Sequence, residues 1–502
     1  MRRSLLPATL LCVLVALCAC LSGTALAATK HRKPKPVTVP GTLLKLAQRQ
    51  RITPAQYHGY LNQWVGDLRE EGKLHGWRKQ NLADVTELLH ELAADDQMTA
   101  ARLPVIFMTL QRNAEYWQTA PKALVYADRV EFPGSLLEWE YYPGYGLQLQ
   151  VLGTFGEANG FYEAGKAHYP QLEQVLSEME QVAVPRAGGI AWEYYFNWEG
   201  GTPPWVSAMA QATGIEALTN GYLASGDQSY LTEAHDALGL LETAPPTGVA
   251  VPTRLGERYL QYSFAPNDDI INAFLQTLIG LYDYVQVSHD PVAQTLFNQG
   301  NAQAQAELPN FVVNGWSLYQ PGQLDNLNYH QLVTGFAQSL CQKLKVEIYC
   351  ATANTFDGDL TSHPTLTQVT RQQTAGRAFQ FRFTVSKPAY VGITLSAGAK
   401  KYLYTKLLFR AGSHAFKTRK LKAGVYSVAM SATDLAGNYT RITGSLEVCR
   451  GGCPAPPPNT TTTPTTTAPT TTTSPTSTTP TTTTPTTTTP TTTTPGSGGS
   501  GF

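Results

Sequence analysis

Charged residues are scarce in this chain of 502 residues, and several catalytic motifs are missing. Only 15% of the residues are charged, and 37 Lys and Arg balance 37 Asp and Glu, so the net charge identifies no class of partner. The sequence has no glycine-rich phosphate loop, no nucleophile elbow and no Cys or His pair at metal-ligand spacing. These absences argue against a nucleotide-dependent enzyme, a serine hydrolase and a metalloenzyme. We expect no cofactor, no metal and no nucleic acid.

Long apolar runs are also rare. One run, at 10–21, follows a pair of arginines and precedes an Ala-Leu-Ala sequence ending at Ala27, which is typical of a secretory signal peptide over residues 1–28. A lipoprotein anchored through Cys20 is a weaker alternative, because Cys18 stands where an apolar or small residue is preferred. No later run approaches the ~20 residues of a membrane span. We expect a secreted or envelope-associated protein.

Cysteine is scarce as well, with seven residues, of which three precede residue 29. The other four form an even set in an oxidising compartment. The simplest pairing joins Cys341 to Cys350 and Cys449 to Cys453, each closing a short loop. A zinc site is the alternative, but no clustered histidines support it.

Composition divides the chain into segments. Residues 29–50 are basic and proline-rich and predict a linker, and residues 51–350 show helical periodicity. Residues 360–449 alternate apolar and polar positions between turns, and their end resembles bacterial immunoglobulin-like modules, so we expect a small β-sandwich. Residues 454–502, mostly Thr and Pro, predict a disordered stalk.

The β module is rich in Lys and Arg, so the balanced total hides an acidic front and a basic back. An anionic glycan or a cell-envelope polymer is one partner that such a module would bind. A solvated spacer is the alternative.

The predicted helices arrive in pairs, separated by loops rich in glycine and aromatic residues. This alternation predicts a mainly α, (α/α) toroid-like domain in which inner helices surround a cleft and the loops at one mouth supply the chemistry. An extended, aromatic hairpin is expected near 125–140. The expected pairs are 147–165 with 169–183, 205–224 with 229–241, and 268–286 with 291–307, followed by a helix at 330–343.

Residues 203–227 organise this domain. Apolar residues from Ala208 to Tyr222 recur every three or four positions and form one stripe of a helix. Small residues such as Gly214 fill much of the remaining surface, so another element or a ligand can approach the backbone closely.

The same stretch, PPWVSAMAQATGIEALTNGYLASGD, resembles the C-terminal domain of the D-glucuronyl C5-epimerase family, which inverts glucuronate to iduronate within heparan-type polysaccharides. Two further blocks agree in order: QYSFAPNDDIINAFLQTLIGLYDY at 261–284 and GWSLYQPGQLDNLNYHQL at 315–332. The resemblance extends over about residues 142–340. Three ordered blocks are more specific than any one of them.

The resemblance implies a set of catalytic residues. Epimerisation at C5 removes a proton next to a carboxylate and returns it to the opposite face, so acid-base groups must flank the ring. In the family these groups are tyrosines and an acidic residue. By position, Tyr329 matches the Tyr-His pair and is our first candidate for proton transfer, and Tyr319 and Tyr262 match the other tyrosines.

The sequence departs from the family at two places. Gln261 replaces the acidic residue before Tyr262, and an amide cannot take up a proton. The arginine expected after Tyr319 is replaced by Pro321 and Gly322. The residues that can substitute are the carboxylates of Glu193, Glu199 and Glu257 and the cations of Arg254 and Arg258.

Other residues are expected to bind substrate, although each has a packing alternative. His330 orients Tyr329 or caps its helix, and aromatic residues stack on sugar rings or pack in the core. The full set of expected substrate-binding residues is Gln261, His330, Trp205, Gln211, Asn272, Arg254, Arg258 and Tyr145.

Three functions remain open. The first is a uronate C5-epimerase that acts on an acidic polysaccharide, either alone or as a homodimer. The second is a lyase on the same fold, because removal of the C5 proton also begins β-elimination. The third is a non-catalytic glycan-binding relative, which Gln261 favours.

Overall fold

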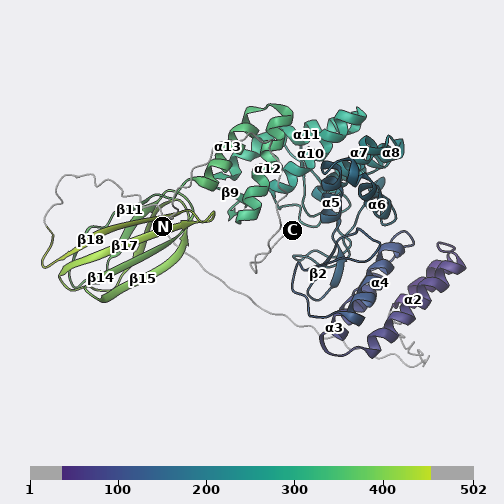
Figure 1. Ribbon diagram of the computed structural model, residues 1–502, viewed down its shortest axis with the longest axis horizontal. Coiled ribbons are helices and arrows are strands. Elements are labelled where there is room, and N and C mark those ends of the chain that lie inside the picture. Colours follow the sequence, from purple (N-terminus) through teal and green to yellow (C-terminus); the bar gives the residue numbers. More distant parts are fainter. Residues whose placement is uncertain (1–36, 454–502) are drawn as a thin grey trace, which may run out of the picture. The chain divides into compact units, whose positions relative to one another are not determined.

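The structure, a computed structural model, describes residues 37–453 and divides at residue 362 into a helical unit and a β unit (Figure 1). The predicted signal peptide and the Thr/Pro-rich segment lie outside the described residues. Within residues 37–453, no helix combines the length and the apolar character of a membrane span.

The helical unit begins earlier than expected. Residues 39–48, which we assigned to a linker, form a helix because Thr38 caps it by accepting from the amide of Gly41, and because Val39 and Leu43 are buried. The predicted cap at Thr53 is present and forms a reciprocal capping box with Gln56. The first four helices are α1 (Val39–Gln48), α2 (Pro54–Lys73), α3 (Gly76–Ala94) and α4 (Leu103–Thr119).

Helical hairpins follow, as the sequence predicts. The first helix of each hairpin packs against the first helix of the next, so that α5, α7, α10 and α12 form an inner row, and α6, α8, α11 and α13 pack against them from outside. This order matches the inner and outer helices of an α/α fold. The hairpins are α5 (Val151–Glu163) with α6 (Tyr169–Glu180), α7 (Ala208–Ser225) with α8 (Gln228–Asp236), α10 (Ile271–Ser288) with α11 (Pro291–Glu307), and α12 (Leu327–Leu344) with α13 (Glu347–Thr361).

Glycines set the distance between the inner helices. A Cβ on Gly280 of α10 would lie 2.2 Å from the carbonyl oxygen of Ala212 on α7, and one on Gly214 would lie 2.8 Å from the Phe155 ring of α5. The small residues of α7 therefore accommodate neighbouring helices, which is the first of the two possibilities raised by the sequence.

Three boundaries differ from prediction. The helix expected from residue 147 begins at Val151, because the buried residues before it pair in a sheet of β1 (Arg129–Val130), β2 (Trp139–Tyr142) and β3 (Gly146–Leu149). The helix expected at 229–241 is interrupted before α9 (Gly239–Glu242). The final helix, α13, continues past residue 350 to Thr361, so the helical unit is longer than the sequence suggests.

Short hairpins occupy the loops between the helices, mostly ahead of inner helices, and they carry much of the candidate site. They are β4 (Val184–Arg186) with β5 (Gly189–Ala191), β6 (Ala250–Pro252) with β7 (Glu257–Tyr259), and β8 (Val312–Val313), β9 (Trp316–Gln320) and β10 (Gln323–Leu324). Two 3-10 turns, η1 (Lys166–His168) and η2 (Leu308–Phe311), complete the unit.

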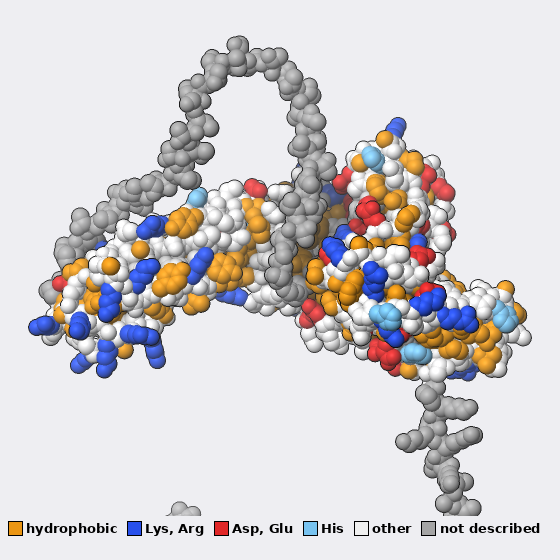
Figure 2. Space-filling view, turned by 60° about the horizontal axis from the view of Figure 1, so that its bottom comes forward, with side chains coloured by type: hydrophobic (Ala, Val, Ile, Leu, Met, Phe, Trp, Pro, Cys, Tyr) orange, Lys and Arg blue, Asp and Glu red, His pale blue; other side chains and the backbone are white. Residues whose placement is uncertain are grey.

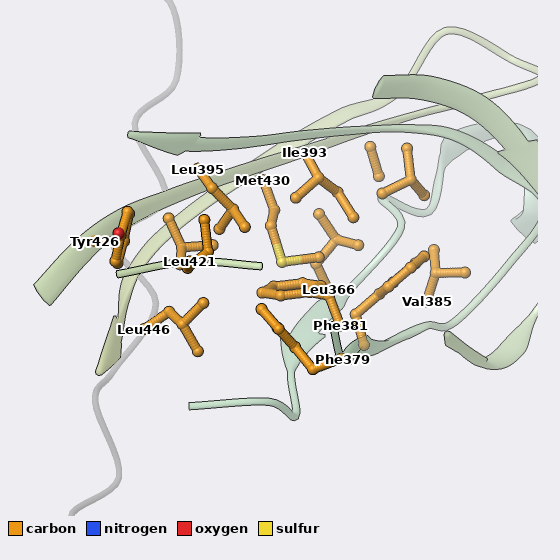
Figure 3. Packing of buried hydrophobic residues seen from close by; sticks show 14 of the residues in the cluster. Leu366, Phe379, Phe381, Val385, Ile393, Leu395, Leu421, Tyr426, Met430 and Leu446 are labelled. Atoms are coloured by element: carbon orange, nitrogen blue, oxygen red, sulfur yellow. The ribbon is translucent and has the colours of Figure 1, made fainter. Parts of the chain in front are cut away.

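The β unit is a two-sheet structure with one apolar core. Phe381 and Phe383 from one sheet pack with Val391, Ile393 and Met430 from the other, all fully buried (Figure 3). Alternating inward residues along each long strand produce this core, as the sequence pattern predicts. One sheet has the order β11 (Leu366–Gln368), β13 (Gln380–Val385), β16 (Gly412–Lys417), and the other β12 (Gln372–Thr374), β18 (Tyr439–Cys449), β17 (Gly424–Asp434), β14 (Ala389–Ala397), β15 (Lys400–Phe409).

Both predicted disulfides are present. Cys341 of α12 bonds to Cys350 of α13, with their Cα atoms 4.7 Å apart, and Cys449 at the end of β18 bonds to Cys453. The first bond ties together the two helices of the last hairpin.

Candidate active site

Three tyrosines from separate segments meet at one end of the inner helices. Tyr262 follows β7, Tyr319 lies in β9, and Tyr329 occupies the first turn of α12. The rings of Tyr319 and Tyr329 are 5.1 Å apart, and the hydroxyls of Tyr319 and Tyr262 lie close enough to shift each other's pKa. Asn326 fixes the start of α12 by accepting from the amide of Tyr329 at 2.9 Å. The structure thus brings together the three residues that the sequence singled out.

All three tyrosines have raised pKa values. Burial is the main cause for each, and the neighbouring tyrosines add to the effect at Tyr319 and Tyr329. Because the ordinary pKa of tyrosine is already about 10, the three phenols are protonated at neutral pH. They can donate protons, whereas a base has to come from elsewhere.

Trp198 and Tyr126, which sequence reasoning did not select, border the cluster. The ring of Trp198 stacks on that of Tyr126 at 6.0 Å and meets the edge of Tyr142 at 5.7 Å. A hydrogen bond from the Trp198 side chain lowers the pKa of Tyr262, although burial outweighs it. The density of aromatic residues at 192–198 was the only sequence signal that placed Trp198 near the tyrosine cluster.

Glu199 is the carboxylate within electrostatic range of both Tyr262 and Tyr319. It sits in a tight turn in which the amides and carbonyls of Trp198 and Gly201 bond to each other at 3.1 and 2.7 Å. Its φ is 44° and that of Gly200 is 88°, values of a turn that favours Asn-Gly. A glutamate in this left-handed conformation is uncommon, and such positions concentrate at functional sites. Burial, followed by Asp268, raises its pKa.

The β1–β2 hairpin carries a cation, Arg129, that is linked to the tyrosine cluster through Glu140. Arg129 is paired across the strands with Glu140, and its Nε lies 3.2 Å from that carboxylate, while Nη1 lies 2.6 Å from Glu138. Glu140 in turn interacts with Tyr142 and is within electrostatic range of Tyr329. Burial raises the pKa of Glu138 to about 7. Arg129 is half-exposed and is therefore accessible to a ligand.

His330 does not contact a ligand site, contrary to our expectation. Its ring is fully buried and stacks on Trp316 at 3.8 Å. Nδ1 lies 2.7 Å from the Ser317 hydroxyl and Nε2 lies 3.0 Å from the carbonyl oxygen of Phe356. Both ring nitrogens are within hydrogen-bond distance of protein groups, so His330 joins α12, β9 and α13. It thereby helps to fix the first turn of α12, which carries Tyr329.

Arg258 and Gln211 are likewise structural. The guanidinium of Arg258 pairs with Glu307 and, at 3.2 Å, with Asp269, so two carboxylates already neutralise it. The amide nitrogen of Gln211 donates to the carbonyls of Ile190 and Ala237, both at 2.9 Å. We remove both residues from the expected substrate-binding set.

Glu193 is also unavailable as a base. Its buried carboxylate lies 2.7 Å from Arg102 Nε and 2.6 Å from Arg186 Nη1, and it accepts from the hydroxyl of Tyr195 at 2.8 Å. Two guanidiniums and a phenol thus occupy the oxygens of this carboxylate. It anchors the strands that precede α7.

Trp205 and Asn272 support the site from the core. Trp205 is 1% exposed, stacks on Tyr194 at 4.1 Å and meets the edge of Tyr262 at 5.6 Å. The side-chain oxygen of Asn272 accepts from the amide of Ala273 at the start of α10. Trp205 therefore orients Tyr262 instead of offering a face to sugar.

The remaining predicted residues lie around the cluster. Gln261 is buried beside Ser207, whose hydroxyl donates to it at 3.4 Å. Tyr145 is half-buried, 6.0 Å from the ring of Phe196. Arg254 is exposed in the β6–β7 turn, and Glu257 begins β7. Over residues 37–453, His, Cys, Asp and Glu side chains form no group suited to a metal ion.

The region that carries the tyrosines matches a known family. Residues 188–358 fit the model of a family described as D-glucuronyl C5-epimerase C-terminus. A D-glucuronyl C5-epimerase of Caenorhabditis elegans is 38% identical over 86 residues, which are 17% of this chain and 14% of that relative. The matched region therefore belongs to a family of carbohydrate epimerases. That family is the D-glucuronyl C5-epimerase C-terminal family.

Solved structures with some similarity also include sugar enzymes. A sugar epimerase from a ruminal bacterium is 15% identical, with a TM-score of 0.29 over 42% of this chain and 57% of its own. Cellobiose 2-epimerase from Bacillus thermoamylovorans is 11% identical, with a TM-score of 0.33 over 55% and 73%. An α-mannanase from Bacteroides thetaiotaomicron is 13% identical, with a TM-score of 0.33 over 46% and 66%.

Proposed function

We propose that the helical unit inverts C5 of glucuronate residues in an acidic polysaccharide outside the cytoplasm. The observation that carries this proposal is the convergence of Tyr262 from one sequence block that resembles the epimerase family with Tyr319 and Tyr329 from a second block. Proton exchange at C5 requires hydroxyl or carboxylate groups on both faces of a ring, and this cluster supplies hydroxyls from three directions.

Tyr329 is the acid in this proposal. Its raised pKa keeps the phenol protonated, so it can deliver a proton to one face of C5. On the other face, a hydroxyl of the Tyr262–Tyr319 pair accepts the C5 proton while its own proton passes to Glu199. The bond from C5 to hydrogen is broken on one face and remade on the other, which leaves Glu199 protonated and Tyr329 ionised. Exchange with solvent then removes the proton from Glu199 and returns one to Tyr329, so atoms and charge balance over the cycle. Glu199 takes the role of the acidic residue that Gln261 replaces.

Arg129 supplies the positive charge that the developing anion needs. Removal of the C5 proton sends negative charge into the uronate carboxyl group, which a nearby cation stabilises. Both arginines pair with two carboxylates, but the Arg129 side chain is 53% exposed against 22% for Arg258, and Arg129 is linked through Glu140 to the environment of Tyr329. Arg129 therefore stands in for the arginine missing after Tyr319.

Deuterium incorporation tests the proposal. The full chain is incubated in heavy water with heparosan-type and other glucuronate polymers, and label at C5 is measured by NMR. We expect label with the wild type and at least a ~100-fold slower rate with Tyr329→Phe, the usual scale for loss of an acid-base group. Tyr282→Phe is the matched control, because this hydroxyl donates to the carbonyl of Lys343 on α12.

Other results identify the alternatives. Absorbance from an unsaturated product, without label in recovered polymer, would establish a lyase. Binding without label or absorbance would establish a non-catalytic relative, the function that Gln261 favours. Equal label from wild type and Tyr329→Phe would remove Tyr329 from the chemistry.

A further inference from the structure

The β unit carries a large and almost uncompensated positive charge. Residues 363–453 contain 14 Lys and Arg but only two acidic residues, Asp434 and Glu447. Asp434 is buried and bonded at 2.8 Å to the buried Lys387, so this pair cancels. Residues 363–453 then hold thirteen further cations and one further carboxylate, that of Glu447. Figure 2 shows Lys and Arg side chains beside hydrophobic patches on this unit, with little Asp or Glu.

Two of these cations share one row on the outer face of the five-stranded sheet. The row crosses β15, β14, β17 and β18 through the register Lys406, Gly392, Ser431, Arg441. Inward neighbours such as Val391 and Ile393 fill the core, so the row points away from it. At about 4.8 Å between strands, the two cations stand roughly 14 Å apart along the row.

Tyrosines flank this row on the same face. Tyr390, two residues before Gly392, and Tyr439, two residues before Arg441, lie in the next outward-facing row on one side. Tyr404, two residues before Lys406, lies in the next outward-facing row on the other side. They are exposed by 44%, 52% and 71%, far more than rings that serve the core. Exposed aromatic rings of this kind offer apolar faces for stacking.

Small residues form the floor between the tyrosines and the cations. A Cβ on Gly392 would lie 2.9 Å from the Ser431 hydroxyl oxygen. Because Gly392 has no side chain, the middle of the row projects less from the sheet than its two ends. Thr394, Ala429 and Thr433 occupy the adjacent positions of the flanking rows. The face therefore combines a low polar floor, raised aromatic rings and a cation at each end.

We propose that this outer face, defined by Tyr390, Tyr404, Tyr439, Lys406 and Arg441, binds an anionic polysaccharide chain. Sugar rings stack on the tyrosines, and carboxylates of the chain pair with Lys406 and Arg441. The charge of the unit selects an acidic chain over a neutral one. That the chain is a uronate polymer rests on the proposed function, whereas its anionic character rests on the β unit alone.

The test measures binding of full-length protein to heparosan at two salt concentrations, with dextran as the neutral comparison. We expect at least tenfold weaker binding for Lys406→Gln/Arg441→Gln and for Tyr404→Ala/Tyr439→Ala, and little affinity for dextran. The matched control is Lys417→Gln/Lys420→Gln, which removes the same charge from β16 and the loop after it. We expect this control to change binding less than twofold.

Each other outcome overturns the proposal. Equal weakening by both charge pairs would show diffuse attraction without a site, and unchanged binding by the face variants would place the site elsewhere. Equal competition by a single-stranded polynucleotide would show that the face does not recognise sugar. Label incorporation at C5 of a short glucuronate oligosaccharide tests the proposed function separately from the binding face. The face variants should label this oligosaccharide at the wild-type rate, whether or not they bind the polymer more weakly.

Discussion

Tyr319 of β9 and Tyr329 of α12 lie with their ring centroids 5.1 Å apart and their planes inclined by 52°. The short connection between them forms a strand and a helix cap, with Asn326 accepting from the amide of Tyr329. Ser317 and Asp325, which are hydrogen-bonded to each other, hold the two ends of this connection together. Two phenols are thereby fixed at one place by local chain geometry.

Glu199→Gln is expected to slow C5 label incorporation by about 100-fold or more, because the amide cannot take up the proton. The wild-type rate should fall as the pH drops through the raised pKa of Glu199, since only the ionised carboxylate is a base. This acidic limb should be absent in the residual activity of Glu199→Gln. Rates from pH 4 to 8 check both points, with Glu87→Gln on exposed α3 surface as the control. An unchanged rate would assign the base to another group.

Glu193→Gln is expected to destabilise the helical unit by roughly 3–5 kcal/mol, because it leaves two buried guanidiniums without their carboxylate. Arg102 and Arg186 are only 16% and 10% exposed. Glu115→Gln removes an exposed pair with Arg112 and should cost less than about 1 kcal/mol. Chemical denaturation compares the two variants, and similar losses would contradict a buried anchoring role for Glu193.

Glu216→Gln is expected to change how stability depends on pH. Burial raises the pKa of this carboxyl from 4.5 to about 7, so between these values the folded state keeps a proton that the unfolded state releases. Stability from this group is therefore full below pH 4.5 and is lost as the pH rises through 7. The variant should match the wild type near pH 4 and exceed it by on the order of 3 kcal/mol at pH 8, because each unit of the pKa shift is worth about 1.4 kcal/mol. Thermal melts across this range measure the difference, and a constant difference would refute the assignment.

Gly280→Ala is expected to destabilise the helical unit by about 1–3 kcal/mol, because its Cβ would lie 2.2 Å from a backbone oxygen of α7. Gly335→Ala in α12 meets no atom within 4 Å and should stabilise by roughly 0.5–1 kcal/mol through helix propensity. Opposite shifts in melting temperature are the expected result. A stabilised Gly280→Ala would mean that α7 and α10 can separate at little cost.

Much of this fold follows from periodicity. The helices at α7 and α10 and the alternation in β14 and β17 are carried by neighbours in sequence, so they can be read without the structure. The single apolar stripe predicted for α7 is wrong, because residues 208–215 are all buried. Residues 39–48 were missed because their proline and basic surroundings resemble a linker, although Val39 and Leu43 are buried. Boundaries such as Val151 depend on strand pairing with distant residues.

The candidate site was predictable only in part. Tyr262, Tyr319 and Tyr329 were found through family blocks, since no spacing relates residues from a loop, a strand and a helix. Trp198 and Arg129 were missed for the same reason, because packing alone brings their segments to the tyrosines. His330 was misassigned because its partners, Ser317 and Phe356, come from other elements.

The inner row of helices gives the tyrosine cluster an electrostatic character that its side chains alone do not. The first turn of α12 carries Tyr329, the amide of Ala208 at the start of α7 bonds to Leu260 at 2.9 Å, and the amide of Leu152 at the start of α5 bonds to Tyr194 at 3.1 Å. The positive ends of parallel helix dipoles therefore converge beside the cluster, each equivalent to about half a unit charge. In the proposed function, the field of these dipoles favours an anionic substrate at the mouth where the arginine expected after Tyr319 is missing, and added salt should weaken that attraction.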